Sequence, residues 1–195
     1  MLKKFIILGN HYSRHFKLSG YMGKENIQLG CGDKPLNNFL NIDFYNKRHA
    51  DELIDLNQPL PYQSETFDLI FSDNVFEHIQ NLLQLIKECH RILKKGGHLI
   101  VKTPYFKSKH AFVDPTHTNF FTIQSMDYYV KDTYSYKEYR FFEDCFDELN
   151  IFLDHDNNLL KKTVEFLALR RPTFFENSLL SNIIVFQNIT YILKK

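Results

Sequence analysis

A regular succession of short apolar runs between residues 26 and 104 most constrains the fold of this chain. Each run is too short for a typical helix but has the length of a buried strand, and polar or turn-forming residues separate the runs. Strands are predicted at residues 26–29, 39–43, 51–56, 67–72 and 98–104. Strands that alternate with crossover connections predict a mostly parallel sheet covered on both faces, in an α/β fold.

A helix is predicted between the fourth and fifth of these strands. Asn74 can act as its N-cap, and Glu77 stands three residues later, as in a capping box. Gly96-Gly97 is a typical C-terminal stop. Apolar residues recur at helical spacing and form one stripe: Phe76, Ile79, Leu83, Ile86, His90 and Leu93.

The pattern becomes irregular after Pro104. Residues 105–130 are polar and aromatic, and we expect them to form an insertion on the substrate side, because open α/β sheets bind ligands at the carboxyl ends of their strands. Later elements are expected as a short helix at 123–130, a helix at 174–186, and strands at 146–154 and 188–194. We interpret residues 1–195 as a single domain, with residues 1–25 as an N-terminal lid or cap.

The bulk composition narrows the class of protein. The formal net charge of +1 does not favour a nucleic-acid partner. Cys31, Cys89 and Cys145 stand far apart and suggest neither a disulfide framework nor a CxxC metal site. No apolar stretch is long enough for a signal peptide or an uninterrupted membrane span, so we expect a cytoplasmic protein.

The stretch "NIQLGCGDKPLNNFLNIDFY" suggests a nucleotide-type cofactor site. Glycines after a buried strand allow a ligand to approach the backbone, and an acidic residue at the end of the next strand can accept hydrogen bonds from a ribose diol. Gly30, Gly32 and Asp43 have this arrangement. Such a turn by itself often only connects two strands. The missing third glycine and the short spacing to Asp43 disfavour a dinucleotide site, and with it a nicotinamide oxidoreductase.

Residues 26–104 as a series resemble the class I S-adenosylmethionine-dependent methyltransferases, in particular the methyltransferase-11-like group. The similar motifs are "IQLGCG", "NID", "DELIDLNQPLPYQSETFDLIFS" and "NVFEHI…CHRILKKGGHLIV". The resemblance implies a Rossmann-like three-layer sandwich, whose seven-stranded, mostly parallel sheet has an antiparallel last strand, "NITYILK". It also implies S-adenosylmethionine as the cofactor.

The same resemblance assigns cofactor-binding residues. Gly30, Cys31 and Gly32 would meet the methionine portion of the cofactor, Asp43 the ribose, and Asp55 with Leu56 the adenine. Ser72 and Asp73 stand at the carboxyl end of the fourth strand, and this position makes them further candidates to border the same molecule. The alternative for Asp73 is that it only solvates the N-terminus of the following helix. Two departures bear on cofactor binding, because Gln28 stands where many relatives have an acidic residue and Lys34 where a third glycine is frequent.

A narrower resemblance covers "SKHAFVDPTHTNFFTIQSMDYY", which looks like the "DPTH…FFT" segment of predicted methyltransferases suspected of acting in surface-glycan pathways. In this segment His110, Asp114 and His117 form an H-x3-D-x2-H pattern. One or both histidines are candidates for the base that removes a proton from the acceptor. The alternatives are a metal site and a loop in which Asp114-Pro115 merely starts a turn.

Other residues allow two interpretations. Glu77 and His78 fall on the family's "E-H" pair, where a capping role is favoured for Glu77 and where His78 either contacts substrate or only packs. His11 and His15 are spaced for one face of a helix and suggest a surface or lid. The aromatic residues of the insertion are expected mainly as core or loop anchors: Tyr105, Phe106, Phe120 and Phe121.

The expected function is therefore S-adenosylmethionine-dependent methyl transfer to an oxygen or nitrogen nucleophile of a small molecule or glycan. Two alternatives stay open. The domain could bind S-adenosylmethionine without catalysis, or it could be a metal-dependent hydrolase that uses His110, Asp114 and His117. The sequence is compatible with a homodimer.

Overall fold

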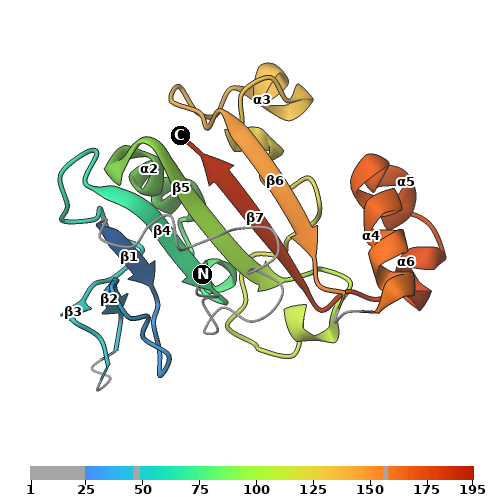
Figure 1. The fold of residues 1–195 in the computed structure, drawn as a ribbon, viewed down its shortest axis with the longest axis horizontal. Helices are drawn as coiled ribbons and strands as arrows, with labels where there is room; N and C mark the ends of the chain where they lie inside the picture. The colour runs from blue at the N-terminus through green and yellow to red at the C-terminus, as the bar shows by residue number, and fades with distance from the viewer. Residues whose placement is uncertain (1–24, 46–48, 156–157) are drawn as a thin grey trace, which may run out of the picture.

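One seven-stranded sheet organises the molecule. The computed structural model describes residues 25–45, 49–155 and 158–195. The strand order is β3-β2-β1-β4-β5-β7-β6 (Figure 1). Neighbouring strands among the first five pair in parallel, whereas β7 pairs antiparallel with both β5 and β6. The strands are β1 (Asn26–Leu29), β2 (Leu40–Asp43), β3 (Glu52–Leu53), β4 (Phe67–Asp73), β5 (Leu93–Pro104), β6 (Glu148–Leu153) and β7 (Asn188–Lys194).

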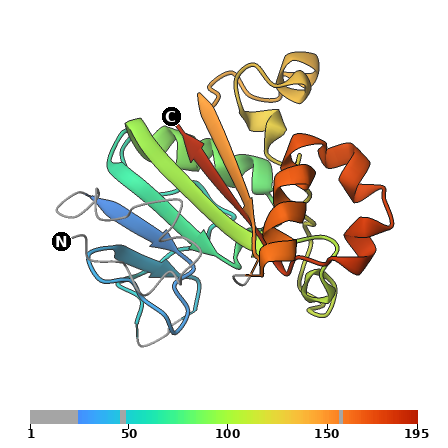
Figure 2. The same cartoon turned by 45° about the vertical axis from the view of Figure 1, so that its right-hand side comes forward.

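Helices of the described residues lie between β4 and β5 and after β5. The α-helices are α2 (Leu82–Ile92), α3 (Tyr134–Tyr139), α4 (Leu159–Arg170), α5 (Pro172–Glu176) and α6 (Leu180–Ile183). The 3₁₀ helices are η3 (Phe76–His78), η4 (Lys109–Ala111) and η5 (Asp127–Tyr129). The two views show α4, α5 and α6 grouped together beside β6 (Figures 1 and 2). Within the described ranges no helix combines the length and the apolar character needed to cross a membrane.

Two hydrophobic clusters occupy opposite faces of the sheet, as the alternation of side chains along strands requires. The larger cluster joins residues such as Ile70 of β4, Val101 of β5 and Tyr191 of β7 to the buried sides of α2, α4 and α5. The smaller cluster contains Phe71 of β4 and Ile100 of β5, together with Leu36 and Phe39 of the β1–β2 connection. The central strands therefore bury apolar side chains on both faces, which explains the consecutive apolar residues Leu69–Phe71 of β4 and Leu99–Val101 of β5.

These findings confirm the Rossmann-like α/β fold and the antiparallel last strand predicted from the sequence. Strands predicted at 26–29 and 188–194 coincide with β1 and β7. The strand predicted at 51–56 is shorter, since β3 comprises only Glu52–Leu53 at the exposed edge of the sheet.

The predicted start and end of the helix between β4 and β5 are wrong. Asn74 does not cap it but has a left-handed φ of 56°, and η3 forms a separate turn. The N-cap of α2 is Asn81, whose side-chain oxygen accepts a hydrogen bond from the backbone N–H of Gln84. At the other end α2 stops at Ile92, and Gly96-Gly97 lies inside β5. The chain between β4 and α2 therefore forms the separate 3₁₀ helix η3 and not the first turn of a long helix.

The single helix predicted at 174–186 is also wrong, because the structure has two short helices, α5 and α6. Ser178 and Ser181 use their hydroxyls to donate hydrogen bonds to nearby carbonyls, a competition that weakens continuous helix. The preceding helix, α4, was not predicted, since several of its large apolar residues are exposed and break the amphipathic pattern: Leu159, Leu160, Phe166 and Leu167.

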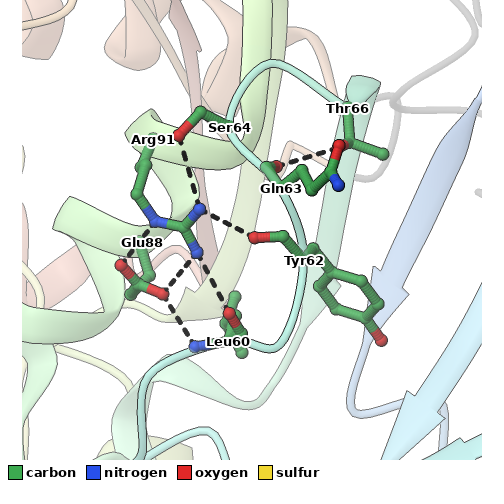
Figure 3. A network of polar contacts seen from close by, with 7 residues as sticks. All are labelled: Leu60, Tyr62, Gln63, Ser64, Thr66, Glu88 and Arg91. Carbon is green, nitrogen blue, oxygen red and sulfur yellow. Dashed lines mark hydrogen bonds and ion pairs between the residues drawn. The ribbon is translucent and has the colours of Figure 1, made fainter.

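A polar network fastens the β3–β4 connection to α2 (Figure 3). Arg91 of α2 forms an ion pair of 2.8 Å with Glu88 and donates hydrogen bonds to the carbonyls of Leu60 and Tyr62. Glu88 in turn accepts from the backbone N–H of Leu60 at 2.7 Å. Because these backbone groups belong to a connection without regular structure, the Arg91–Glu88 pair supplies partners that a helix or strand would otherwise provide.

Candidate functional site

The predicted cofactor residues gather at one edge of the sheet. β1, β2 and β4 are neighbouring parallel strands, so their carboxyl ends lie together. Gly30, Asp43 and Asp73 stand at or next to these ends. The order β2-β1-β4 also contains the point at which the strand order reverses, and open α/β sheets bind ligands at this position.

The turn after β1 needs glycine at two positions for different reasons. Gly30 has φ +64° and Gly32 has φ +54°, a region that other residues rarely adopt. A Cβ at Gly30 would lie 2.4 Å from Cγ2 of Val75, whereas a Cβ at Gly32 would meet nothing within 4 Å. The backbone therefore packs closely against Val75 at Gly30 and faces open space at Gly32.

Asp43 is tied to this turn by its carboxylate. Oδ2 accepts the backbone N–H of Gly32 at 2.8 Å, and Oδ1 accepts that of Tyr45 at 3.1 Å. The backbone N–H of Cys31 donates to the carbonyl of Ile42 in β2. Each carboxylate oxygen has two acceptor positions, so Asp43 retains capacity for two further donors such as a pair of ribose hydroxyls.

The other predicted cofactor residues have distinct surroundings. Asp55 accepts hydrogen bonds from the backbone and side chain of Asn57, and Leu56 is buried in the core. Ser72 is fully buried, and its hydroxyl has no hydrogen-bond partner among the described residues. Asp73 forms an ion pair of 3.0 Å with Lys102 of β5. The structure thus places all of these residues near the ends of β3 and β4.

Gln28 and Lys34, the two departures from the family pattern, are partners in the structure. The side-chain amide of Gln28 donates to the carbonyl of Lys34 at 3.1 Å and accepts the backbone N–H of Leu36 at 2.8 Å. Gln28 therefore braces the β1–β2 connection, which contains no helix to satisfy its backbone groups.

Glu77 lies in η3, just beyond the carboxyl end of β4, and its predicted capping role is wrong. Its side chain is buried, with 1% exposure. Oε2 accepts the hydroxyl of Thr103 at 3.1 Å, while Oε1 has no hydrogen-bond partner among the described residues. Burial raises the pKa of Glu77 to about 7. A buried carboxylate of this kind is a frequent mark of a functional site.

Two histidines lie beside this carboxylate. The ring centroids of His78 and His117 are 4.6 Å apart. Nδ1 of His78 lies 2.9 Å from Oγ1 of Thr116, and this hydroxyl lies 2.6 Å from Oδ1 of Asp114. Burial and the neighbouring His117 lower the pKa of His78, whereas hydrogen bonds from Thr116 lower the pKa of the half-buried Asp114. The hydrogen bond between His78 and Thr116 therefore links the insertion to the Glu77-His78 pair.

The predicted H-x3-D-x2-H pattern is divided in the structure. Asp114 and His117 belong to the group around Glu77 and His78. His110 is exposed in η4, and its backbone N–H donates a hydrogen bond to the hydroxyl of Ser108. Sequence reasoning missed the burial of Glu77 next to His117, although the "E-H" pair was a usable signal. His11 and His15 lie outside the described residues.

The insertion at 105–130 is anchored by its aromatic residues. Tyr105 and Phe121 are buried in the larger cluster and form an isolated parallel bridge. Phe120 is exposed and stacks on Phe112, with ring centroids 4.9 Å apart. Backbone N–H groups of Thr118 and Asn119 donate to the carbonyl of Glu77. The insertion is thus fastened over the carboxyl end of β4.

Comparisons with known proteins agree with this geometry. Residues 38–101 match the methyltransferase-11 family model, described as a methyltransferase domain. An S-adenosylmethionine-dependent methyltransferase from Archaeoglobus fulgidus superposes with a TM-score of 0.60 at 17% identity, covering 91% of each chain. A second one, from Mesorhizobium loti, superposes with a TM-score of 0.53 at 15% identity, covering 97% of this chain and all of that one. These likenesses show the fold.

The resemblance to class I methyltransferases is therefore confirmed, and S-adenosylmethionine is the cofactor expected from it. Among curated proteins, a malonyl-[acyl-carrier protein] O-methyltransferase of Coxiella burnetii is 46% identical over 44 residues, 23% of this chain and 16% of that protein. The ubiquinone biosynthesis O-methyltransferase of Rattus norvegicus is 32% identical over 79 residues, 40% of this chain and 21% of that protein. The matches thus cover under a quarter of the length of these two relatives.

Proposed function

We propose that this protein transfers a methyl group from S-adenosylmethionine to an oxygen or nitrogen nucleophile of a small molecule or glycan. The observation that carries the proposal is the Asp43 carboxylate, which is fixed to the glycine turn at the switch point of a class I methyltransferase fold. The family match over residues 38–101 supports the same function, because it includes Asp43 and the end of β4.

The residues at this edge fit the cofactor. Open space above Gly32 admits a ligand next to the backbone, and Asp43 keeps acceptor positions for two hydroxyl donors. The buried hydroxyl of Ser72 lacks a partner that a ligand could supply. We assign Gly30 to Gly32 to the methionine portion, Asp43 to the ribose, and Asp55 with Leu56 to the adenine; Ser72 and Asp73 border the same molecule.

S-adenosylmethionine supplies an electrophilic methyl group when bound. The protein then has to orient the acceptor, exclude water and take up one proton, and orientation alone contributes roughly 7–11 kcal/mol in well-placed reactions. His117 is our candidate for the proton acceptor, with Asp114 acting on the neighbouring His78 through Thr116. His110 remains a candidate for acceptor contact from the exposed rim of the insertion.

The Asp43→Asn substitution tests the ribose assignment. The amide keeps the shape of the side chain and one oxygen acceptor but removes the charge. Since a hydrogen bond to a charged group is worth about 1.5–3 kcal/mol, we expect a roughly 10- to 100-fold loss of affinity for S-adenosylmethionine in isothermal titration calorimetry. Asp33→Asn, which changes an exposed carboxylate of the same connection, is the matched control and should bind like the wild type.

Equal affinity of the Asp43→Asn variant and the wild type would refute the assignment. A labelled-methyl assay against panels of hydroxylated, amino and glycan acceptors addresses the reaction itself. Tight binding of S-adenosylmethionine without transfer to any acceptor would support the alternative of a non-catalytic binding module.

A further inference from the structure

We propose that Glu77, His78 and His117 form a binding site for one divalent transition-metal ion of the Zn²⁺ type. One ligand atom from each residue lies within 4.8 Å of the others. Glu77 and His78 come from η3, and His117 comes from the insertion that folds over it. The inference goes beyond methyl transfer, and the binding of the ion can be measured directly. Because a bound ion would occupy the free nitrogen of His117, His117 can accept a proton from the acceptor only in the metal-free protein.

The hydrogen bonds of the two histidines determine which nitrogen can bind a cation. Thr116 gives its only hydroxyl proton to Asp114, so its oxygen must accept from Nδ1–H of His78. Nδ1 of His117 lies 3.0 Å from the carbonyl of Ala111, which can only accept. Each neutral ring therefore carries its proton on Nδ1 and keeps the lone pair on Nε2. Metal-binding histidines have this same arrangement, in which the second nitrogen donates to an oxygen.

Glu77 supplies the third ligand. Its Oε1 is buried and has no hydrogen-bond partner among the described residues, while its Oε2 is oriented by Thr103. A buried carboxylate oxygen without a partner is costly, and a bound cation would remove that cost. One oxygen of the Glu77 carboxylate is thus held by Thr103 while the other lacks a partner among the described residues, and this points to a ligand at this position.

The segments that carry the ligands are held together without any ion. Backbone N–H groups of Thr118 and Asn119 donate to the carbonyl of Glu77 at 2.8 and 3.1 Å, and the side chain of Asn119 donates to the carbonyls of Phe76 and Ile79. His117 is adjacent to these residues in the chain. Binding of Zn²⁺ at distances of about 2.0–2.2 Å would draw together three ligand atoms that already lie within 4.8 Å of one another.

The donor set selects the class of ion. Two imidazoles and one carboxylate suit Zn²⁺ and related transition ions, whereas Mg²⁺ prefers oxygen ligands. Three protein ligands leave at least one coordination position for water or for an oxygen of an acceptor. This site differs from the H-x3-D-x2-H pattern, since His110 takes no part and Asp114 only positions His78 through Thr116.

Titration of the metal-free, full-length protein with ZnCl₂ in a calorimeter tests the proposal. We expect one tight site, no comparable binding of MgCl₂, and visible absorption bands of a four-coordinate complex with CoCl₂. Residues that only orient a metal ligand typically contribute roughly 10- to 100-fold to metal affinity. We expect a larger loss of Zn²⁺ affinity in each of the three ligand variants, Glu77→Gln, His78→Ala and His117→Ala. His110→Ala, an exposed histidine of the same segment, is the matched control and should bind Zn²⁺ like the wild type.

The positioning role of Thr116 gives a finer test. Thr116→Val removes the acceptor of the His78 Nδ1 proton and should lower Zn²⁺ affinity roughly 10- to 100-fold. Thr116→Ser keeps the hydroxyl and should restore the affinity. Circular dichroism of each variant establishes that the fold is retained.

Two outcomes would overturn the proposal: no stoichiometric Zn²⁺ binding, or binding unchanged in Glu77→Gln, His78→Ala and His117→Ala. Neither outcome concerns S-adenosylmethionine, whose affinity is measured separately with the Asp43→Asn variant. Failure of the metal site and failure of the proposed methyl transfer are therefore distinguishable.

Discussion

At the scale of single residues, Gly30 shows that one substitution can test two physical effects. The residue adopts a left-handed conformation, and its missing side chain leaves room for Val75. Gly32 shares the conformation but not the contact. The glycine turn is therefore specified partly by packing within the protein and partly by the open space next to Gly32.

We expect Gly30→Ala to destabilise the protein more than Gly32→Ala. The backbone cost of placing alanine in the left-handed region is about 1–2 kcal/mol at either position, and Gly30→Ala adds a clash with Val75. Urea unfolding measures both free energies. A double variant with Val75→Ala should recover part of the loss at Gly30; equal losses for the two single variants would contradict the packing argument.

At the scale of elements, α2 both covers the sheet and holds the β3–β4 connection. The Arg91–Glu88 pair provides hydrogen-bond partners for the backbone of residues 60–64, which has no regular secondary structure (Figure 3). Hydrogen bonds from Arg91 lower the pKa of Glu88. A carboxylate whose pKa is lower in the folded state stabilises that state above its unfolded pKa, and this contribution is lost as the pH falls through its folded pKa.

The Glu88→Gln variant should therefore be less stable than the wild type by about 1–2 kcal/mol at pH 7. The difference should shrink as the pH falls through the lowered pKa of Glu88, because Glu88 of the wild type then becomes protonated and loses its charge. Urea unfolding of both proteins at pH 7 and at a series of lower pH values measures this change. Glu65→Gln is the control, since the contact of Glu65 with Lys195 is long and partly exposed. A stability difference between the wild type and Glu88→Gln that does not change with pH would contradict the stabilising role of the Glu88 charge.

At the scale of the whole molecule, β7, which is formed by residues 188–194, is inserted between β5 and β6 of the sheet. It pairs with both of these strands. Ile189, Tyr191 and Leu193 are fully buried in the larger cluster. The sheet therefore depends on contacts between residues that are far apart in sequence.

A variant that ends at residue 187 should not fold cooperatively, because β6 would lose the strand with which it pairs. Circular dichroism and thermal unfolding measure the outcome. Removal of Lys195 alone is the control, since it leaves β7 intact. The residue's own contacts are lost: side-chain hydrogen bonds to the carbonyls of His90 and Leu93, backbone hydrogen bonds with Gly96 and Gly97, and a long contact with Glu65. A cooperative transition in the shorter variant would show that the sheet is stable without β7.

Local patterns predicted the elements that packing leaves nearly unchanged. Residues 26–29 and 188–194 are short runs with apolar residues between turn-forming neighbours, and almost all of them are buried, so β1 and β7 were found at their true bounds. The family motifs predicted the fold, which is confirmed. Two sets of roles stay predictions: cofactor binding by Gly30, Cys31, Gly32, Asp43, Asp55, Leu56, Ser72 and Asp73, and catalysis by His110, Asp114 and His117.

The sequence by itself determined the succession of strands along residues 26–104, because hydrophobic periodicity is a local property of the chain. Only the tertiary structure decided the surroundings of Glu77, whose local pattern suggested a helix cap. Residues 103 and 116–119 surround it from distant parts of the chain, and their hydrogen bonds turn the segment after β4 inward. Such long-range contacts leave no periodic signal, and therefore the grouping of Glu77, His78 and His117 became visible only in three dimensions.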